Sequence, residues 1–362
     1  MILYLIDNFS LTDIRAYAIY GACTGLIPLA PVFGGIIADR LLGFRKAITI
    51  GCILLTVGFV MLGFNQYINI FYAMSFIICG YGLFRSNVQC LLGSLYNKDN
   101  ENLRGSGFIV LMIAGNIGGF IAAVTSGFVA NYYNWSASFI VSGVGMFMGL
   151  CIFLLGFKHY TKSESHKFIF KRKLYIEMVT VAIVIIWIMS SYILLEYMLV
   201  GYMISFIVIL SSIFLFIIWR GSTKAMKKKL NFIFLLMIFG TLFWIITQQM
   251  GSSVTVFIKH NIDTYIMGIN VPASALTSMN FFAIIVGGSG VAWCFARIKS
   301  NDDFIDMVQF SLGLILLTMS FLLLFIAAKM ATIDGSSSSI WIIVSLFLWG
   351  ASELFINPLA LS

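Results

Sequence analysis

Two charged side chains of opposite sign lie inside apolar stretches of this sequence. Arg85 lies in the segment G-Y-G-L-F-R-S-N, which starts at Gly80, and Glu353 lies in the apolar stretch from Ile340 to Leu361. A charge at the centre of a bilayer costs about 2.5–3.5 kcal/mol on insertion scales, so it normally faces a partner, a cavity or a substrate. The two charges could neutralise each other as a structural pair. We favour the interpretation that they bind the two ends of a zwitterion, because intramembrane charges are functional by default.

Composition predicts that membrane helices position these charges. The chain has 362 residues, of which 60% are hydrophobic and 10% charged, whereas a soluble domain is roughly half apolar and about a quarter charged. Apolar stretches of about 20 residues recur, each long enough to cross a hydrocarbon core of about 30 Å. We therefore predict an all-α, multi-pass protein of the inner (plasma) membrane. The net charge of +8 lies in loops, so it indicates topology, and no nucleic-acid partner is expected.

Eleven segments are predicted to span the membrane as helices, after a short apolar stub, Met1 to Leu5, that cannot span it. They are 14–37, 44–64, 68–90, 105–130, 136–157, 174–195, 197–219, 231–256, 272–296, 304–329 and 340–361.

The distribution of basic residues predicts which loops face the cytoplasm. If the 38–46 loop is cytoplasmic, 18 of the 22 Lys and Arg residues lie on that side, three (Arg15, Lys259 and Lys329) lie opposite, and the remaining one is Arg85. This asymmetry follows the positive-inside rule. We therefore expect residue 8 outside and residue 362 near the cytoplasm.

Two basic loops suggest a three-part organisation. The loops 158–173 and 220–230 bracket a helical hairpin, 174–219, which has few polar groups in its apolar stretches and no seam of small residues. We predict an N-terminal bundle (1–157), a middle part with the basic loops and the inserted hairpin (158–230), and a C-terminal bundle (231–362). The hairpin is expected to face lipid.

The segment G-G-I-I-A-D-R-L-L-G-F-R-K, starting at Gly34, joins two predicted spans. Small residues allow helices to approach closely, and an acid near the start of the following helix is electrostatically favoured. An ordinary charged turn is the alternative. We predict a conformational latch between moving halves, made of Gly34, Gly35, Asp39, Arg40 and Gly43.

Together with this loop, five further blocks give the sequence a specific resemblance. The loop resembles G-G-x-x-A-D-R-x-L-G of the proton-dependent oligopeptide transporter (POT) family, in the major facilitator superfamily. The other blocks are similar to the family's G-x-G-x-F-K-P-N (Gly80 to Asn87), S-G-F-x-x-F-Y-x-x-I-N-x-G-A-F (Ser106 to Phe120), F-W-x-x-x-E-Q-x-G-S-S (Phe243 to Ser253), S-x-N (Ser278 to Asn280) and G-E-x-x-x-S-P (Ser352 to Pro358).

The resemblance implies substrate-binding roles for five residues. Arg85 matches a lysine expected to bind the peptide carboxylate, and Glu353 matches a glutamate expected to bind the peptide amino group. Asn116 and Asn280 match asparagines that hydrogen-bond the ligand, and Trp244 matches an aromatic residue of the pocket. From the residues alone, Asn116 suits a helix–helix hydrogen bond equally well, and Trp244 suits a core or interface position better.

The sequence also departs from the family pattern. The opening helix with its E-x-x-E-R motif is missing, Gln248 replaces the helix-seven acid, and Pro28 and Met112 replace pocket tyrosines. We expect a superfamily bundle with two extra hairpin helices, lacking most of helix one and helices eleven and twelve. No cofactor or metal is expected, and protons are the possible coupling ion, although the family's usual coupling residues are replaced or missing.

The resemblance implies a secondary active transporter of di- and tripeptides, a peptide:proton symporter family member. The alternatives are a non-transporting truncated remnant and one part of a split-gene transporter. An enzyme is not expected, because no H-E-x-x-H, G-x-S-x-G or carboxylate cluster occurs at membrane depth. Small peptides and the lipid bilayer are the expected partners, and the oligomeric state is left open. We expect this chain alone not to accumulate peptides against a gradient.

Overall fold

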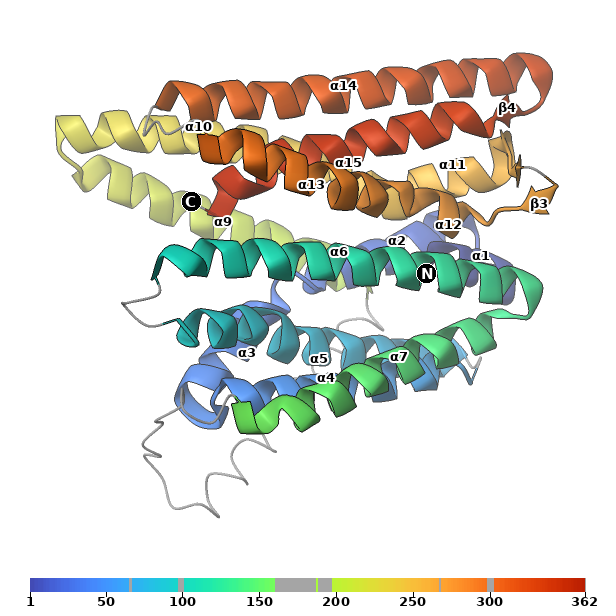
Figure 1. Ribbon diagram of the computed structural model, residues 1–362, viewed down its shortest axis with the longest axis horizontal. Coiled ribbons are helices and arrows are strands. Elements are labelled where there is room, and N and C mark those ends of the chain that lie inside the picture. The colour runs from blue at the N-terminus through green and yellow to red at the C-terminus, as the bar shows by residue number, and fades with distance from the viewer. Residues whose placement is uncertain are drawn as a thin grey trace. The chain divides into compact units, whose positions relative to one another are not determined.

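The structure is a computed structural model that describes residues 1–64, 67–96, 101–159, 187, 197–266, 268–297 and 303–361. Long helices make up nearly all of it (Figure 1). In this part of the chain, eight helices are long and apolar enough to cross a membrane, and Ala273–Gly288 is a shorter apolar helix. The predicted all-α, multi-pass membrane fold is confirmed. The predicted span 174–195 lies outside the described residues, apart from Trp187.

Contacts divide the chain into two compact units. The first consists of Met1–Gly105 and Trp135–Trp244, and the second of Ser106–Asn134 and Ile245–Ser362. This grouping assigns Ser106–Asn134 to the C-terminal residues, whereas the sequence-based division kept it in the N-terminal bundle. The division into 1–157, 158–230 and 231–362 stays a prediction.

The helices of the first unit are α1 (Ile2–Phe9), α2 (Asp13–Leu26), α3 (Ala30–Ile37), the π-helix η1 (Ala38–Leu42), α4 (Phe44–Leu62), α5 (Tyr67–Ser94), α7 (Trp135–Leu155), η3 (Gly156–His159), α9 (Tyr197–Gly221) and most of α10 (Lys224–Thr247). The second unit holds most of α6 (Glu101–Tyr132), then η4 (Gln248–Gly251), α11 (Ser253–Asn261), α12 (Ala273–Thr277), α13 (Met279–Arg297), α14 (Asp303–Asp334) and α15 (Ser339–Leu361), with the two-residue strands β1 (Ile262–Asp263), β2 (Tyr265–Ile266), β3 (Ile269–Asn270) and β4 (Ser337–Ser338).

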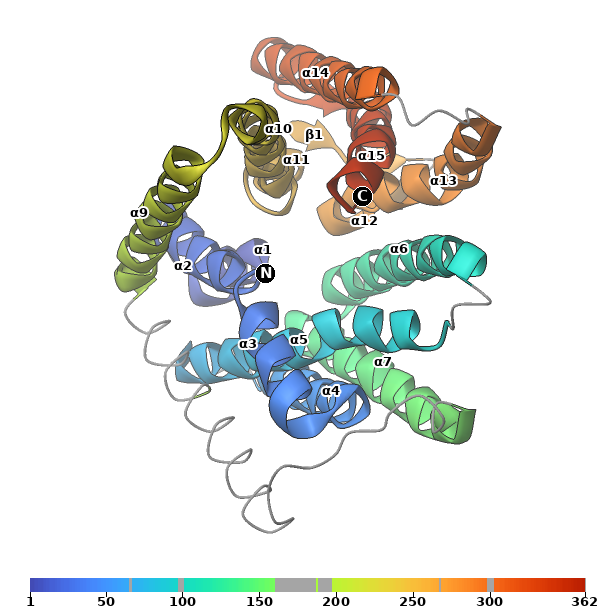
Figure 2. The same cartoon turned by 90° about the vertical axis from the view of Figure 1, so that its left-hand side faces the viewer.

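Glycines set the packing of the first unit, in which α4 packs against α5 and α7, and α3 packs against α5 (Figure 2). A Cβ added to Gly51 would lie 2.9 Å from the Gly80 carbonyl oxygen, and one added to Gly58 would lie 2.9 Å from the Ala73 carbonyl oxygen. The backbones of α4 and α5 therefore touch along two turns. Such close approach is how apolar helices gain packing energy in a membrane, where burial from water supplies no driving force between them.

The chain begins with a helix that is buried in the first unit. Tyr4 is fully buried in α1, and its hydroxyl donates a 3.3 Å hydrogen bond to the carbonyl oxygen of Leu62 at the end of α4. Its ring contacts Phe9, Trp135 and Phe139, with centroids 4.7–5.9 Å apart. The apolar stub that is too short to span a membrane thus packs as a small helix against α4 and α7.

Three predicted spans are present but are interrupted. The span 14–37 breaks into α2 and α3 at residues 27–29, because Pro28 and Pro31 lack the N–H groups that would continue the ladder. The span 231–256 passes from α10 through the 3₁₀ turn η4 into α11, and the span 272–296 divides into α12 and α13 at Ser278. The interruptions divide the spans without removing them, since Asp13–Leu42 and Met226–Asn261 are each long and apolar enough to cross a membrane.

In the second unit, α15 packs against both α13 and α14. Gly350 of α15 lies against the backbone of Asn280, and Gly313 of α14 lies against Ile356, 2.6 Å from an added Cβ. The buried hydroxyls of Ser320 and Ser345 join α14 to α15 at 2.9 Å. Strand β1 pairs in parallel with β4, so the loop after α11 is tied to the loop before α15.

We predict that Gly34→Ala destabilises the protein by about 1–3 kcal/mol, because the added methyl group would meet the Gly82 carbonyl, and the backbones must move apart. Gly21→Ala is the matched control, since nothing lies within 4 Å of its added Cβ, and alanine favours a helix over glycine. The free energy of unfolding in detergent measures both. Equal stability of the two variants would contradict the backbone contact.

Candidate functional site

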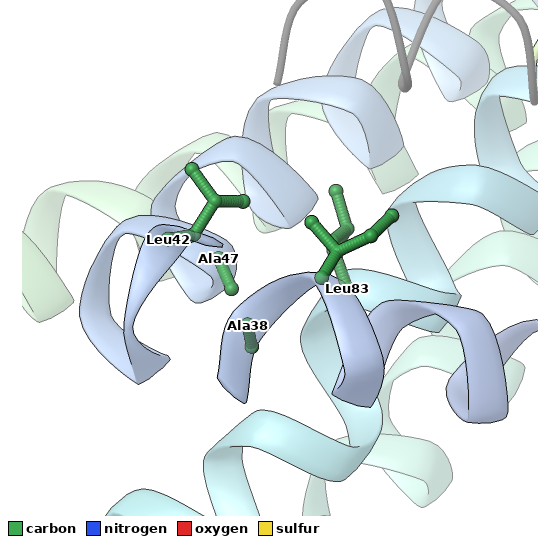
Figure 3. Packing of buried hydrophobic residues seen from close by; sticks show 5 residues of the cluster. Ala38, Leu42, Ala47 and Leu83 are labelled. Atoms are coloured by element: carbon green, nitrogen blue, oxygen red, sulfur yellow. The ribbon is translucent and has the colours of Figure 1, made fainter. Parts of the chain in front are cut away.

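Asp39 and Arg40 of the predicted latch lie in the π-helical turn η1, and Gly43 follows it. The other two predicted latch residues, Gly34 and Gly35, belong to α3. The latch role stays a prediction. The Gly43 N–H donates to the Ala38 carbonyl at 2.8 Å, which closes η1, and Gly43 has φ +74° and ψ 156°, a conformation that requires glycine. Ala38 and Leu42 are buried with Ala47 and Leu83 (Figure 3), whereas Asp39 and Arg40 are exposed. The turn is therefore fixed by apolar packing and presents its two charges outward, and π-turns frequently occur at functional sites.

Just before this turn, α3 crosses α5 at backbone distance. Gly34 lies against Gly82, and the buried Asn87 amide donates hydrogen bonds to the carbonyls of Gly34 (3.4 Å) and Leu83 (2.8 Å). Asn87 belongs to the segment that starts at Gly80, and the sequence alone assigned it no role. Its signal was an amide two residues after Arg85 in an otherwise apolar helix, where a polar side chain needs a partner.

Arg85 lies on α5 between Gly82 and Asn87, so the crossing of α3 and α5 fixes the position of its backbone. Its side chain is exposed, and within the first unit no described residue forms a hydrogen bond or ion pair with its guanidinium. A guanidinium in this position is free to bind a carboxylate with two parallel hydrogen bonds.

In the second unit, Glu353 of α15 and Asn280 of α13 lie together. Glu353 is 9% exposed and Asn280 is 2% exposed, and the Asn280 Nδ2 donates to Glu353 Oε1 at 3.1 Å. The contact is possible because Gly350, one turn before Glu353, lies against the Asn280 backbone. A buried carboxylate requires hydrogen-bond donors, and Asn280 supplies one of them.

Asn116 lies on α6, in the same unit. Its amide donates to the Met112 carbonyl of its own helix at 2.8 Å. Further along α6, Gly119 lies against Phe281, and Gly127 lies against Ser274. Helix α6 therefore runs antiparallel to the consecutive helices α12 and α13, and this register puts Asn116 level with the turn of α13 that follows Asn280.

Trp244 lies near the end of α10, before the 3₁₀ turn that contains Gln248. Trp244 is 45% exposed, and its ring packs edge-on against the ring of the fully buried Phe243, with centroids 6.0 Å apart. Gln248 is exposed as well. Of the five predicted substrate-binding residues, the structure brings Asn280 and Glu353 into contact, places Asn116 in the same unit, and assigns Arg85 and Trp244 to the other unit. Their binding roles stay predictions.

Apolar helices of membrane length, several of them interrupted, and a buried carboxylate on α15 are features of a secondary transporter. The sequence profile described as "PTR2: POT family" matches residues 45–362. The chain therefore belongs to the POT family, the family of proton-dependent oligopeptide transporters that the motifs resemble.

Relatives named as peptide permeases align along the whole chain. It is 28% identical to dipeptide and tripeptide permease A of Proteus mirabilis over 369 residues, which cover 100% of this chain and 74% of that protein. It is also 28% identical to dipeptide and tripeptide permease A of Citrobacter koseri over 371 residues, covering 100% of this chain and 72% of that protein.

Solved structures of peptide transporters share the fold. Tetrameric PepTSo2 superposes with a TM-score of 0.86 at 23% identity, over 99% of this chain and 78% of that chain. A bacterial homologue of the human drug peptide transporters PepT1 and PepT2 gives a TM-score of 0.83 at 23% identity, over 98% of this chain and 76% of that chain. The fold of the POT family is thereby confirmed, whereas the details of the inserted hairpin stay a prediction.

We predict that Asn280→Ala destabilises the protein by about 1–2 kcal/mol, because a buried carboxylate loses a donor from another helix. Asn116→Ala is the control and should cost less than about 0.6 kcal/mol, since that amide bonds only to its own helix. Unfolding by denaturant in detergent measures the difference. A larger loss for Asn116→Ala would contradict this assignment.

Proposed function

We propose that this chain transports di- and tripeptides across the inner membrane. The observation that carries the proposal is the family match over residues 45–362, together with relatives described as dipeptide and tripeptide permeases over the full length of the chain. The buried Asn280–Glu353 contact supports it, because such a carboxylate is suited to hold an ammonium group away from water.

Glu353 is the proposed acceptor for the peptide amino group. A carboxylate has about four acceptor positions, and the hydrogen bond from Asn280 orients one of its two oxygens. The amide is neutral, so it does not cancel the charge that attracts the ligand. We therefore propose that Asn280 orients the Glu353 carboxylate. We also propose that Asn116, which lies level with the next turn of α13, binds the peptide backbone.

Arg85 is the proposed donor to the peptide carboxylate, and Trp244 is the proposed aromatic lining. A small peptide has an ammonium group and a carboxylate separated by one or two peptide units, so it requires one anionic and one cationic group in its binding site. Arg85 matches the family's lysine position, and arginine keeps the charge while adding bidentate geometry.

Uptake of labelled dialanine tests the transport proposal directly. Proteoliposomes that contain the chain and are preloaded with unlabelled dialanine should exchange it for labelled dialanine, whereas protein-free liposomes should not. Free alanine should compete poorly, because it has no peptide unit for Asn116 and Asn280. An absence of exchange with a correctly folded protein would refute transport by this chain.

We predict that Glu353→Gln weakens dialanine binding by about 30-fold, which corresponds to about 2 kcal/mol. N-acetyl-dialanine lacks the ammonium group, so its weak binding should not change in this variant. Asp13→Asn is the matched control, since Asp13 is exposed in the first turn of α2. Isothermal titration calorimetry measures both ligands. Equal losses for dialanine and the acetylated peptide would disprove the amine-binding role.

Arg85→Gln should show the complementary pattern. Binding of dialanine should weaken by a similar factor, about 30-fold, whereas the already weak binding of dialanine amide, which has no carboxylate, should be unchanged. Arg15→Gln, on the other predicted side of the membrane, serves as the control. Discrimination between dialanine and its amide that survives in Arg85→Gln would exclude Arg85 as the carboxylate-binding residue.

Proton coupling through position 248 is not part of the proposal, because the Gln248 amide does not titrate. We predict that an inward proton gradient does not drive dialanine above its equilibrium level in proteoliposomes. A protonophore supplies the control, since it should leave exchange unchanged. Accumulation that the gradient drives and the protonophore abolishes would contradict this prediction and would make Glu353 and Asp39 the acids to substitute next.

A further inference from the structure

The turn between α9 and α10 concentrates positive charge on the first unit. From Trp219 to Asn231, a segment we call the basic turn, the sequence has five cations and no acidic residue. The cations are Arg220, Lys224, Lys227, Lys228 and Lys229, and all except the half-buried Lys227 are exposed. No described carboxylate forms an ion pair with any of them.

Hydrogen bonds and ring contacts hold the basic turn in a defined conformation. Trp219 Nε1 donates to Asn231 Oδ1 at 2.8 Å, which ties the end of α9 to the start of α10. The Lys227 Nζ lies 4.7 Å from the centre of the Trp219 ring. The Ser222 N–H donates to the Trp219 carbonyl at 3.2 Å, and its hydroxyl to the Ile218 carbonyl at 2.7 Å. The cations are therefore presented from a fixed turn.

The basic turn lies where two membrane helices leave the apolar layer. The apolar span Met198–Gly221 ends in it, and the apolar span Met226–Asn261 begins in it. Trp219 thus occupies the boundary position at which tryptophan is enriched in membrane proteins. Phe216 and Ile217 of α9 are 57% and 61% exposed, so an apolar surface suited to an acyl chain adjoins the cations.

The five cations repel one another, and two of them also lie at the N-terminus of α10, where positive charge is unfavourable. Lys224 and Lys227 lie in the first turn of α10, which contains no acidic residue, although the start of a helix favours negative charge. An external anion at this turn would relieve both effects.

We propose that the basic turn binds the phosphate headgroup of an anionic phospholipid in the cytoplasmic leaflet. Arg220, Lys224 and Lys228 donate to the phosphate oxygens, and an acyl chain lies along the exposed face of α9. Clusters of lysine and arginine at the cytoplasmic end of a membrane helix have this affinity, and each cation contributes roughly a five-fold preference for an anionic surface. The proposal is independent of the peptide site.

Native mass spectrometry of the detergent-purified chain tests it, with phosphatidylglycerol and phosphatidylcholine of identical acyl chains as probes. Phosphatidylglycerol should bind more tightly than phosphatidylcholine, and Lys224→Gln with Lys228→Gln should reduce that preference by about 25-fold. Arg15→Gln with Lys329→Gln removes two cations from the opposite predicted side and should leave it unchanged. Arg220→Gln with Lys229→Gln is a second pair for the case that the first does not fold.

Three outcomes would overturn the proposal. One is equal affinity of the unmodified chain for the two lipids. Another is a preference that survives in both variant pairs of the basic turn. The third concerns the source of the anion: inorganic phosphate that raises the melting temperature as much as phosphatidylglycerol does would assign the turn to a free ion. Circular dichroism of each variant verifies that its helices have formed.

Discussion

A polar side chain in hydrocarbon has no water to bind, and this constraint accounts for many side-chain hydrogen bonds in the part of the chain that the structure describes. Many hydroxyls bond to the carbonyl one turn earlier in their own helix, as Thr56 does to Cys52 and Ser75 does to Phe71. Such bonds satisfy the hydroxyl group but do not connect one helix to another. Other bonds cross between helices, among them those from Asn87 to Gly34, from Asn280 to Glu353, and between Ser320 and Ser345.

Two of these crossings coincide with a glycine that brings two backbones into contact. Asn87 reaches the α3 carbonyl because Gly34 lies against Gly82, and Asn280 reaches Glu353 because Gly350 lies against the Asn280 backbone. An asparagine side chain is short, so a larger residue at either glycine would separate the helices beyond its reach. Close packing at a glycine and the buried polar contact beside it therefore depend on each other. The two candidate ligand-binding charges, Arg85 and Glu353, both lie within one helical turn of such a crossing.

The sequence predicted the features that depend on local pattern, and it missed those that depend on which helices meet. Apolar length gave the spans. Small residues around Asp39 predicted a latch, and the structure forms a π-turn closed by Gly43 at that place, while the latch role stays a prediction. The break at Pro28 follows from proline chemistry, which apolar length alone does not register. By contrast, the role of Asn87 and the grouping of α6 with α13 depend on contacts between distant segments, such as Gly119 with Phe281. No periodicity within one helix encodes such a pairing.

The chemistry of Glu353 limits how a proton could be coupled to a peptide at this site. A carboxylate that holds an ammonium group must be ionised, so a proton on Glu353 removes the charge that the ligand requires. By linkage, proton and peptide then weaken each other's binding, and this antagonism is the reverse of what symport needs. The Asn280 amide cannot change that relation, because it donates to Glu353 without titrating. Symport therefore needs a second acid whose protonation favours the peptide-bound state, and the amide of Gln248, at the matching position of the helix-seven motif, cannot serve as that acid.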